Sequence, residues 1–174
     1  AKRMQIDIAG ETVAVVGAYG AIGSVTAEML AGDAGRILLI GREPARLAQI
    51  AQRLRAAGNA EVATATAVTA LAEAQLVVTV TSAVDTVIRP QHLRRGAIVC
   101  DVARPRDVSR QVVAERPDVL VIEGGMSEVP GPVDFGFDFG FPPGMAYACM
   151  AETMALTLEQ RYASFTLGKD IKLS

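Results

Sequence analysis

The sequence predicts an α/β fold with about six mainly parallel strands in a doubly wound sheet and helices on both faces. Short apolar runs rich in β-branched residues lack the alternation of half-exposed strands, so they indicate strands buried on both faces. Amphipathic helical segments separate these runs, as parallel connections require. A glycine-rich turn joins the first run to the first helix, which is typical of a Rossmann-like dinucleotide-binding sheet.

The strands and helices of this fold can be placed in order along the chain. Residues 12–17, "TVAVVG", form the first apolar run, and a helix follows from Ala21 to about Leu30. Residues 43–58 form the clearest amphipathic helix, with apolar residues at helical spacing and a terminal Gly58. Further strands are expected at residues 36–41, 61–67, 75–82, 97–103 and 118–125, and short helices at residues 90–96 and 109–117.

The chain divides into three parts by composition. We expect a nucleotide-binding domain over residues 1–126, a Gly/Pro/Phe-rich loop over residues 127–144, and a C-terminal helix and tail over residues 145–174 that pack on the same domain. The loop has two interpretations, a cover for the sheet edge or a wall of an apolar substrate site. Because the first residues resemble the tail of a helix, we expect a piece of a longer protein.

The composition limits the kinds of partner. The chain has 174 residues, which suit one domain, with a net charge of −2 and a sequence pI of about 5.5. This balance offers no basic surface for nucleic acid, and no apolar run reaches the roughly 18–20 residues that cross a bilayer. Two separate cysteines and one histidine do not form a usual zinc site and indicate reduced thiols. We therefore expect no metal, no transmembrane segment and a cytoplasmic location, and the oligomeric state stays open.

The glycine turn carries the first specific chemistry. Gly17 permits the tight turn after the first strand, Gly20 lets the backbone approach a pyrophosphate, and Gly23 lets helix and strand pack closely. The helix that begins at Ala21 offers unpaired N–H groups to the phosphates. A glycine turn that serves only packing is the alternative.

The end of the second strand indicates which dinucleotide binds. An NAD site usually has a carboxylate there, but this strand ends in Gly41 and Arg42, with Glu43 just after it and Arg46 one helical turn later. A guanidinium suits the extra 2′-phosphate of NADP, so we predict NADPH over NADH. The alternative is that Arg42 is a solvated residue at the helix start.

Small residues follow the fourth strand, at the edge where the cofactor is expected to lie. These are Thr81, Ser82 and Ala83. The full set of residues predicted to bind the cofactor is Gly17, Tyr19, Gly20, Ala21, Ile22, Gly23, Gly41, Arg42, Arg46, Thr81, Ser82 and Ala83.

Cys149 allows two interpretations. One apolar stripe marks the core side of the helix expected at residues 146–161, namely Tyr147, Ala151, Met154 and Leu158. Cys149 falls on the opposite side, about a turn and a half into the helix, where the helix dipole weakly favours a thiolate. Glu152, one turn later, repels a thiolate unless it is protonated or donates a proton. From the pattern alone, a buried inert thiol and a nucleophile both remain open.

Three stretches resemble the C-terminal part of the cyanobacterial long-chain acyl-[acyl-carrier-protein] reductases, which form fatty aldehydes. They are "IDIAGETVAVVGAYGAIGS", "VLVIEGG" and, most specifically, "MAYACMAETMALTLEQRYASFTLGKDI". The resemblance implies an NADPH-dependent oxidoreductase in which Cys149 takes the acyl group as a thioester that is then reduced to aldehyde. It also implies an acyl-thioester substrate, on acyl carrier protein or CoA, and an N-terminal carrier-binding domain that is absent here. The Phe-rich loop and Met150 depart from the family pattern, so acyl specificity is not carried over.

Two other functions remain open. One is an NADP-dependent dehydrogenase of the shikimate-dehydrogenase-like type, with catalytic residues on a missing domain; the strand end "IGR" and the edge "TSA" favour it, and the Cys149 segment opposes it. The other is a non-catalytic dinucleotide-binding domain that uses the Phe-rich loop and last helix as a contact surface.

Overall fold

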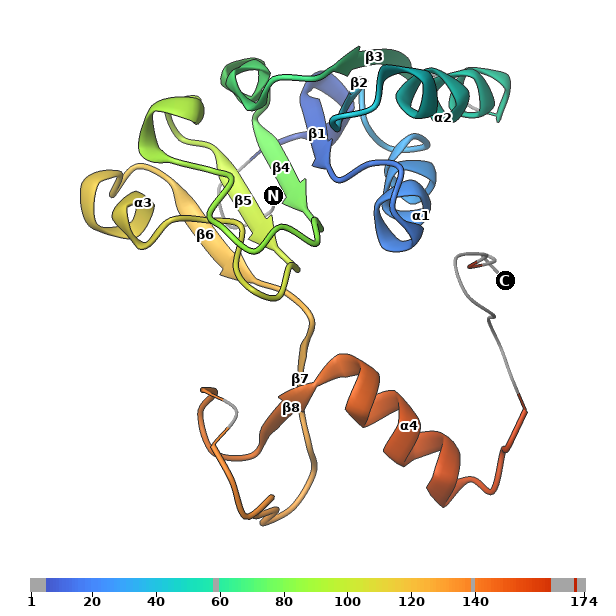
Figure 1. The fold of residues 1–174 in the computed structure, drawn as a ribbon, viewed down its shortest axis with the longest axis vertical. Helices are drawn as coiled ribbons and strands as arrows, with labels where there is room; N and C mark the ends of the chain where they lie inside the picture. Colours follow the sequence, from blue (N-terminus) through green and yellow to red (C-terminus); the bar gives the residue numbers. More distant parts are fainter. Residues whose placement is uncertain (1–5, 58–59, 139, 164–170, 172–174) are drawn as a thin grey trace. The chain divides into compact units, whose positions relative to one another are not determined.

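The computed structural model describes residues 6–57, 60–138, 140–163 and 171. The chain divides into two compact units, one of residues 1–122 and 166–174 and the other of residues 123–165. The first unit contains, in order, η2 (Ile8–Gly10), β1 (Thr12–Val16), α1 (Ala21–Leu30), β2 (Arg36–Ile40), α2 (Pro44–Ala57), β3 (Glu61–Ala65), η3 (Val68–Glu73), β4 (Leu76–Thr79), η4 (Pro90–His92), β5 (Ile98–Asp101), α3 (Arg110–Glu115) and β6 (Leu120–Glu123) (Figure 1). The second contains β7 (Met126–Glu128), β8 (Met145–Tyr147) and α4 (Ala148–Leu158).

The first unit is built on a six-stranded sheet in the order β3-β2-β1-β4-β5-β6. The strands from β3 to β5 run parallel, and β6 lies beside β5. The chain moves outward from β1 to β3 and then returns to the other side of β1, so the strand order reverses between β1 and β4. At this switch point Val16 of β1 pairs with Ile40 of β2 and with Thr79 of β4. The carboxyl ends of the three strands are therefore level, which is where open α/β sheets bind ligands.

The core has two layers, one on each face of the sheet. Val13 and Val15 point to the face covered by α1 and α2, and Ala14 and Val16 point to the face covered by η3, η4 and α3. Because both faces of the central strands are buried, β1 and β2 carry apolar residues at every position after the first, which explains the missing alternation. The predicted Rossmann-like, doubly wound fold is confirmed, with α1 over the predicted residues; the helix stop predicted at Gly58 lies outside the described residues.

The second unit is a β-hairpin followed by a helix. Strands β7 and β8 pair antiparallel, with Ser127 opposite the fully buried Ala146. Residues 129–144 connect them, so the first two residues of the loop predicted over residues 127–144 belong to β7. Within this connection the Phe141 ring lies edge-on to Tyr147, with centroids 4.8 Å apart. The expected packing of the C-terminal helix on the first domain remains a prediction.

Helix α4 starts later than the sequence pattern predicts. Residues 145–147 have helical spacing but pair with β7 as strand β8, so α4 begins at Ala148. Cys149 is thus the second residue of the helix rather than a turn and a half into it. The predicted apolar stripe of this helix is not fully buried by the described residues. Met154 is half-buried and Leu158 is 83% exposed.

Candidate functional site

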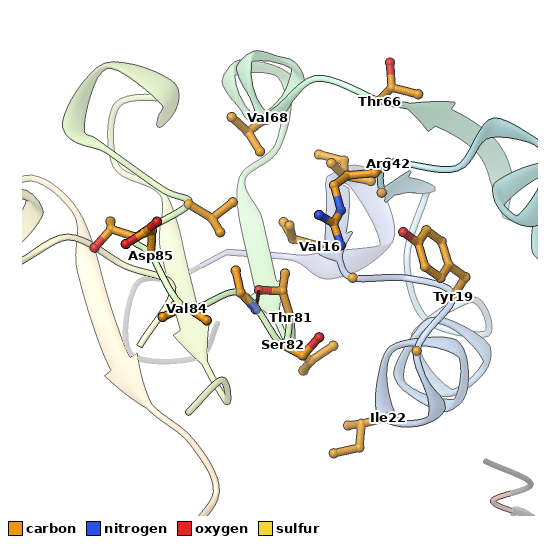
Figure 2. A pocket seen from close by; sticks show the side chains of 18 of the residues that line it. Val16, Tyr19, Ile22, Arg42, Thr66, Val68, Thr81, Ser82, Val84 and Asp85 are labelled. Carbon is orange, nitrogen blue, oxygen red and sulfur yellow. Dashed lines mark hydrogen bonds between the residues drawn. The ribbon is translucent and has the colours of Figure 1, made fainter. Parts of the chain in front are cut away.

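A cavity of about 670 Å³ opens at the carboxyl ends of β1, β2 and β4 (Figure 2). Its lining comes from the turn after β1, the start of α1, the end of β2 and the segment after β4. All the residues predicted to bind the cofactor line this cavity except Gly23 and Arg46. Residues from three separate strand ends therefore meet at the switch point of the sheet.

The glycines of the turn are required by close backbone contacts. Gly17 has a φ of +82°, which favours glycine, and its N–H donates to Ile40 O at 2.9 Å. A Cβ on Gly23 would lie 2.2 Å from Gly17 O, closer than atoms approach, so Gly23 acts by packing behind the cavity rather than by lining it. Gly20 is the N-cap of α1 and has no side chain to occupy the helix end.

The start of α1 offers free donors to an anion. The first bond of the helix runs from Ser24 N to Gly20 O at 2.9 Å. The N–H groups of Ala21, Ile22 and Gly23 precede this ladder, and a ten-residue helix adds the positive end of its dipole. This cradle of backbone amides without side-chain obstruction fits the pyrophosphate of a dinucleotide.

A cationic and aromatic corner closes the cavity beside β2. Figure 2 shows the side chains of Arg42 and Tyr19 directed into the cavity from adjacent segments. Arg46 stands behind them, with its guanidinium carbon 5.4 Å from the centroid of the Tyr19 ring and an ion pair of 3.3 Å to Glu43. Glu43 pairs with Arg46 and does not line the cavity, so Arg42 is the charged side chain that lines the cavity at this corner. This arrangement suits a phosphate better than a ribose hydroxyl.

The segment after β4 forms the opposite wall, and a buried aspartate that the sequence analysis missed holds it. Asp107 is fully buried and accepts hydrogen bonds from the hydroxyl groups of Thr79 and Thr81 and from Thr81 N. Thr81 therefore donates its hydroxyl away from the cavity, while Ser82 follows it at the cavity surface (Figure 2). No local motif marks Asp107, because its partners lie 26 and 28 residues earlier.

A second buried carboxyl group lies at the end of β5. Asp101 accepts from Ala103 N at 3.1 Å and from Val108 N at 2.9 Å. Burial raises the pKa of Asp101 above its usual value, and the nearby Asp107 adds to the effect while backbone N–H donors oppose it. Thr66, and Val68 at the start of η3, also line the cavity, and the sequence analysis did not predict them because no sequence motif marks them.

Cys149 lies in the second unit. Its side chain is exposed, it occupies the second position of α4, and its carbonyl accepts from the Thr153 hydroxyl at 2.9 Å. Glu152 is also exposed. The Cys149 thiol is thus not buried among the described residues, and its role as a nucleophile stays a prediction. By contrast, Cys100 is half-buried on β5, where burial and Asp101 raise the pKa of its thiol. Residues 164–170, at the end of the stretch quoted above, lie outside the described residues.

A smaller cavity of about 470 Å³ lies within the connection between β7 and β8. Its lining includes Phe135, Phe137, Phe141 and Met145, together with Asp134 and Asp138. Within the described residues, no three acidic, histidine or cysteine side chains are grouped closely enough to hold a metal ion. No helix in the described ranges combines the length and apolar character needed to cross a bilayer.

Comparison with curated proteins identifies two informative relatives. The chain is 31% identical over 177 residues to the long-chain acyl-[acyl-carrier-protein] reductase of Synechococcus elongatus, covering 98% of this chain and 50% of that protein. It is 36% identical over 89 residues to the aminotransferase PigE of a Serratia species, covering 50% of this chain and 10% of that protein. The predicted resemblance to the acyl-carrier-protein reductases is confirmed. The chain spans half or less of the length of these relatives.

Solved structures share the fold. The 5-ketofructose reductase of Gluconobacter sp. strain CHM43 aligns with a TM-score of 0.55 and 15% identity, over 71% of this chain and 48% of that one. The quinone oxidoreductase of Thermus thermophilus aligns with a TM-score of 0.50 and 23% identity, over 70% of this chain and 40% of that one.

A family comparison identifies the nucleotide-binding part. The model of the shikimate/quinate 5-dehydrogenase family matches residues 1–123, which contain every strand and helix around the larger cavity. This match covers most of the chain, so the chain belongs to the shikimate/quinate 5-dehydrogenase family of oxidoreductases.

Proposed function

We propose that this chain is the NADPH-binding and acyl-accepting part of a reductase that converts an acyl thioester to an aldehyde through a thioester on Cys149. The observation that carries the proposal is the exposed thiol of Cys149 at the start of α4, in a chain similar over 98% of its length to an acyl-[acyl-carrier-protein] reductase. An exposed thiol is accessible to a bulky thioester. Its position at the helix N-terminus places it where the helix dipole favours negative charge.

The larger cavity supports NADPH as the reductant. Its backbone amides suit the pyrophosphate, and Arg42 with Tyr19 and Arg46 forms a corner that suits a 2′-phosphate. Gly41 contributes by being small, because a Cβ there would lie 2.5 Å from the Tyr19 ring and displace it.

The proposed reaction has two steps whose atoms balance. The Cys149 thiolate attacks the carbonyl carbon of the acyl thioester; the new carbon–sulfur bond forms, the bond to the carrier sulfur breaks, and a proton from water completes the carrier thiol. When bound, the reduced nicotinamide supplies a hydride for the acyl carbon. The bond from that carbon to Cys149 Sγ then breaks, which releases the aldehyde and restores the thiolate.

The remaining parts of the proposal concern the substrate. The apolar loop between β7 and β8 is proposed to contact the acyl chain, and the carrier, acyl carrier protein or CoA, to be bound mainly by an N-terminal domain of the same protein. The similar reductase is about twice the length of this chain, which agrees with such a domain.

Acyl transfer tests the proposal directly. The full-length protein is incubated with palmitoyl-CoA in the absence of NADPH, and the adduct is located by intact mass and peptide mapping. We expect one palmitoyl group on Cys149, lost in Cys149→Ala and retained in the matched control Cys100→Ala, because the Cys100 thiol is half-buried. A wild-type protein that stays unmodified, or a Cys149→Ala variant with full reductase activity, would refute the cysteine mechanism.

One observation favours a second function. The family match ends at residue 123, before the unit that contains Cys149. An NADP-dependent dehydrogenase of the shikimate-dehydrogenase-like type, with catalytic residues on another domain, would use the larger cavity alone. Such an enzyme would keep its activity in Cys149→Ala and would not form the palmitoyl adduct.

A further inference from the structure

The wall of the larger cavity opposite Arg42 is a segment without regular secondary structure. Residues 81–87 all line the cavity and connect β4 to η4. The ladder of β4 ends before them, at Thr79. Their shape must therefore be fixed by contacts other than sheet pairing.

Asp107 makes these contacts at both ends of the segment. At the first end its carboxylate accepts from Thr81 N at 3.1 Å and from the Thr81 hydroxyl, and it also accepts from the Thr79 hydroxyl inside β4. At the other end its main-chain carbonyl accepts from Val87 N and Ile88 N, both at 2.9 Å. One residue thus fixes the entry and the exit of the wall.

Asp107 is itself held firmly. It is fully buried and does not line the cavity. The next residue, Val108, donates its N–H to Asp101 at the end of β5 and bridges to Ile88, and Ser109 N donates to Ile88 O at 2.9 Å. These bonds connect the backbone that follows Asp107 to Ile88 and to the end of β5, which keeps Asp107 beside the wall.

We propose that Asp107 is a positioning residue that holds residues 81–87 in the shape that receives the nicotinamide half of NADPH. The inference rests on the proposed NADPH site. With the 2′-phosphate at Arg42 and the pyrophosphate at α1, the nicotinamide half extends toward the β4 side of the switch point. Without the carboxylate, Thr81 loses its acceptor and the segment samples other conformations. Only the molecules whose segment keeps the receiving shape would then bind NADPH. The apparent affinity is reduced by the fraction of molecules in that shape.

The test separates the two halves of the ligand. Titrations of the full-length protein use NADPH and adenosine 2′,5′-bisphosphate, which carries only the adenine end and the 2′-phosphate. In Asp107→Ala we expect the dissociation constant of NADPH to rise about tenfold, as for the loss of a charged hydrogen-bond acceptor, while that of adenosine 2′,5′-bisphosphate stays within about twofold. Hydrogen exchange without ligand should become faster at the Thr81 amide.

Two further variants keep the test decisive. Thr79→Val is the matched control, because it removes a buried partner of Asp107 but leaves both bonds to Thr81, so NADPH affinity should be close to wild type. Asp107→Asn keeps the side-chain shape and one acceptor oxygen, so it serves if Asp107→Ala does not fold. It should show a smaller loss of NADPH affinity and faster exchange at Thr81.

The outcomes distinguish positioning from simple destabilisation. Equal losses for NADPH and adenosine 2′,5′-bisphosphate, or a Thr79→Val variant as weak as Asp107→Ala, would overturn the inference. Unchanged exchange at Thr81 in a folded Asp107 variant would do the same. A third outcome is that the wild-type protein binds neither ligand, while hydrogen exchange at the Thr81 amide is still faster in the Asp107 variants. In that case Asp107 does hold residues 81–87, and the proposed NADPH site is wrong.

Discussion

At the scale of single residues, the site is set by a few steric and charge requirements. Gly17 and Gly23 are needed because the backbone of the turn leaves no room for Cβ atoms, and such requirements can be predicted from the sequence because the spacing of the glycines encodes them. Arg42 could be predicted in the same way from its place after β2. The burial of Asp107 against Thr79 and Thr81 could not, since it depends on contacts between distant segments.

Arg42 should decide between the two dinucleotides. In Arg42→Ala we expect the dissociation constant of NADPH to rise about tenfold to a hundredfold, and that of NADH to change little, because only NADPH carries the 2′-phosphate that we propose to pair with the guanidinium. Fluorescence titration measures both constants. Arg46→Ala is the matched control and should have a smaller effect, since Arg46 stands behind Tyr19. Equal losses for both cofactors would contradict the assignment.

Gly23 should be indispensable for the packing of α1 on the turn. The methyl group of Gly23→Ala would lie 2.2 Å from Gly17 O, and backbone cannot move aside as a side chain can. We expect the free energy of unfolding to fall by roughly 1–3 kcal/mol despite the better helix propensity of alanine. Urea denaturation measures the change. Gly32→Ala, where nothing lies within 4 Å of the new Cβ, should be nearly neutral, and two equal midpoints would count against the predicted clash.

At the scale of elements, long periodic segments were predictable and short paired ones were not. Helix α2 follows from its apolar periodicity and the central strands follow from their unbroken apolar runs, because each segment carries its own pattern. Strand β8 could not be predicted from its own residues. These three residues form a strand by pairing with β7, from which residues 129–144 separate them in the chain. This pairing delays the start of α4 and brings Cys149 nearer to the helix N-terminus than the sequence predicts.

The connections at the amino-terminal side of the sheet should make stability depend on acid. Arg116 donates to both carboxylate oxygens of Asp118 at 2.8 Å, and Gly96 N donates to the same side chain at 3.0 Å. These bonds hold the pKa of Asp118 well below its usual value. A lowered pKa in the folded state contributes stability that is present above the unfolded pKa of about 4 and is lost as the pH falls below it.

The expected result is a steeper fall of the urea midpoint below about pH 4 in wild-type protein than in Asp118→Asn. Asp101 changes the stability in the opposite direction with pH. Its pKa is raised in the folded state, so the stability that it contributes is lost as the pH rises above about 4. That contribution is common to both proteins and cancels in the comparison. Parallel curves for the two proteins between about pH 5 and pH 2 would rule out the proposed role of Asp118.

At the scale of the whole molecule, the sequence predicts the fold and the position of the larger cavity more completely than it predicts the reaction. The order of strands and helices led to the correct sheet, and the glycine turn and "IGR" strand end led to residues that meet around one cavity. The sequence analysis did not predict the far wall, because residues 84–87 belong to a connection without a motif of its own, bonded to the distant Asp107. The thioester chemistry rests on similarity and on the exposure of one thiol, so it needs a measurement of the reaction itself.

The most direct measurement follows the hydride in a single turnover. The full-length protein is first acylated on Cys149 with palmitoyl-CoA, freed of excess thioester, and then mixed with NADPH that carries deuterium at the transferable position. The account predicts loss of the palmitoyl mass from Cys149 and an equal amount of palmitaldehyde with one deuterium on its carbonyl carbon. An acyl group that stays on Cys149, or leaves only as palmitic acid, would contradict it.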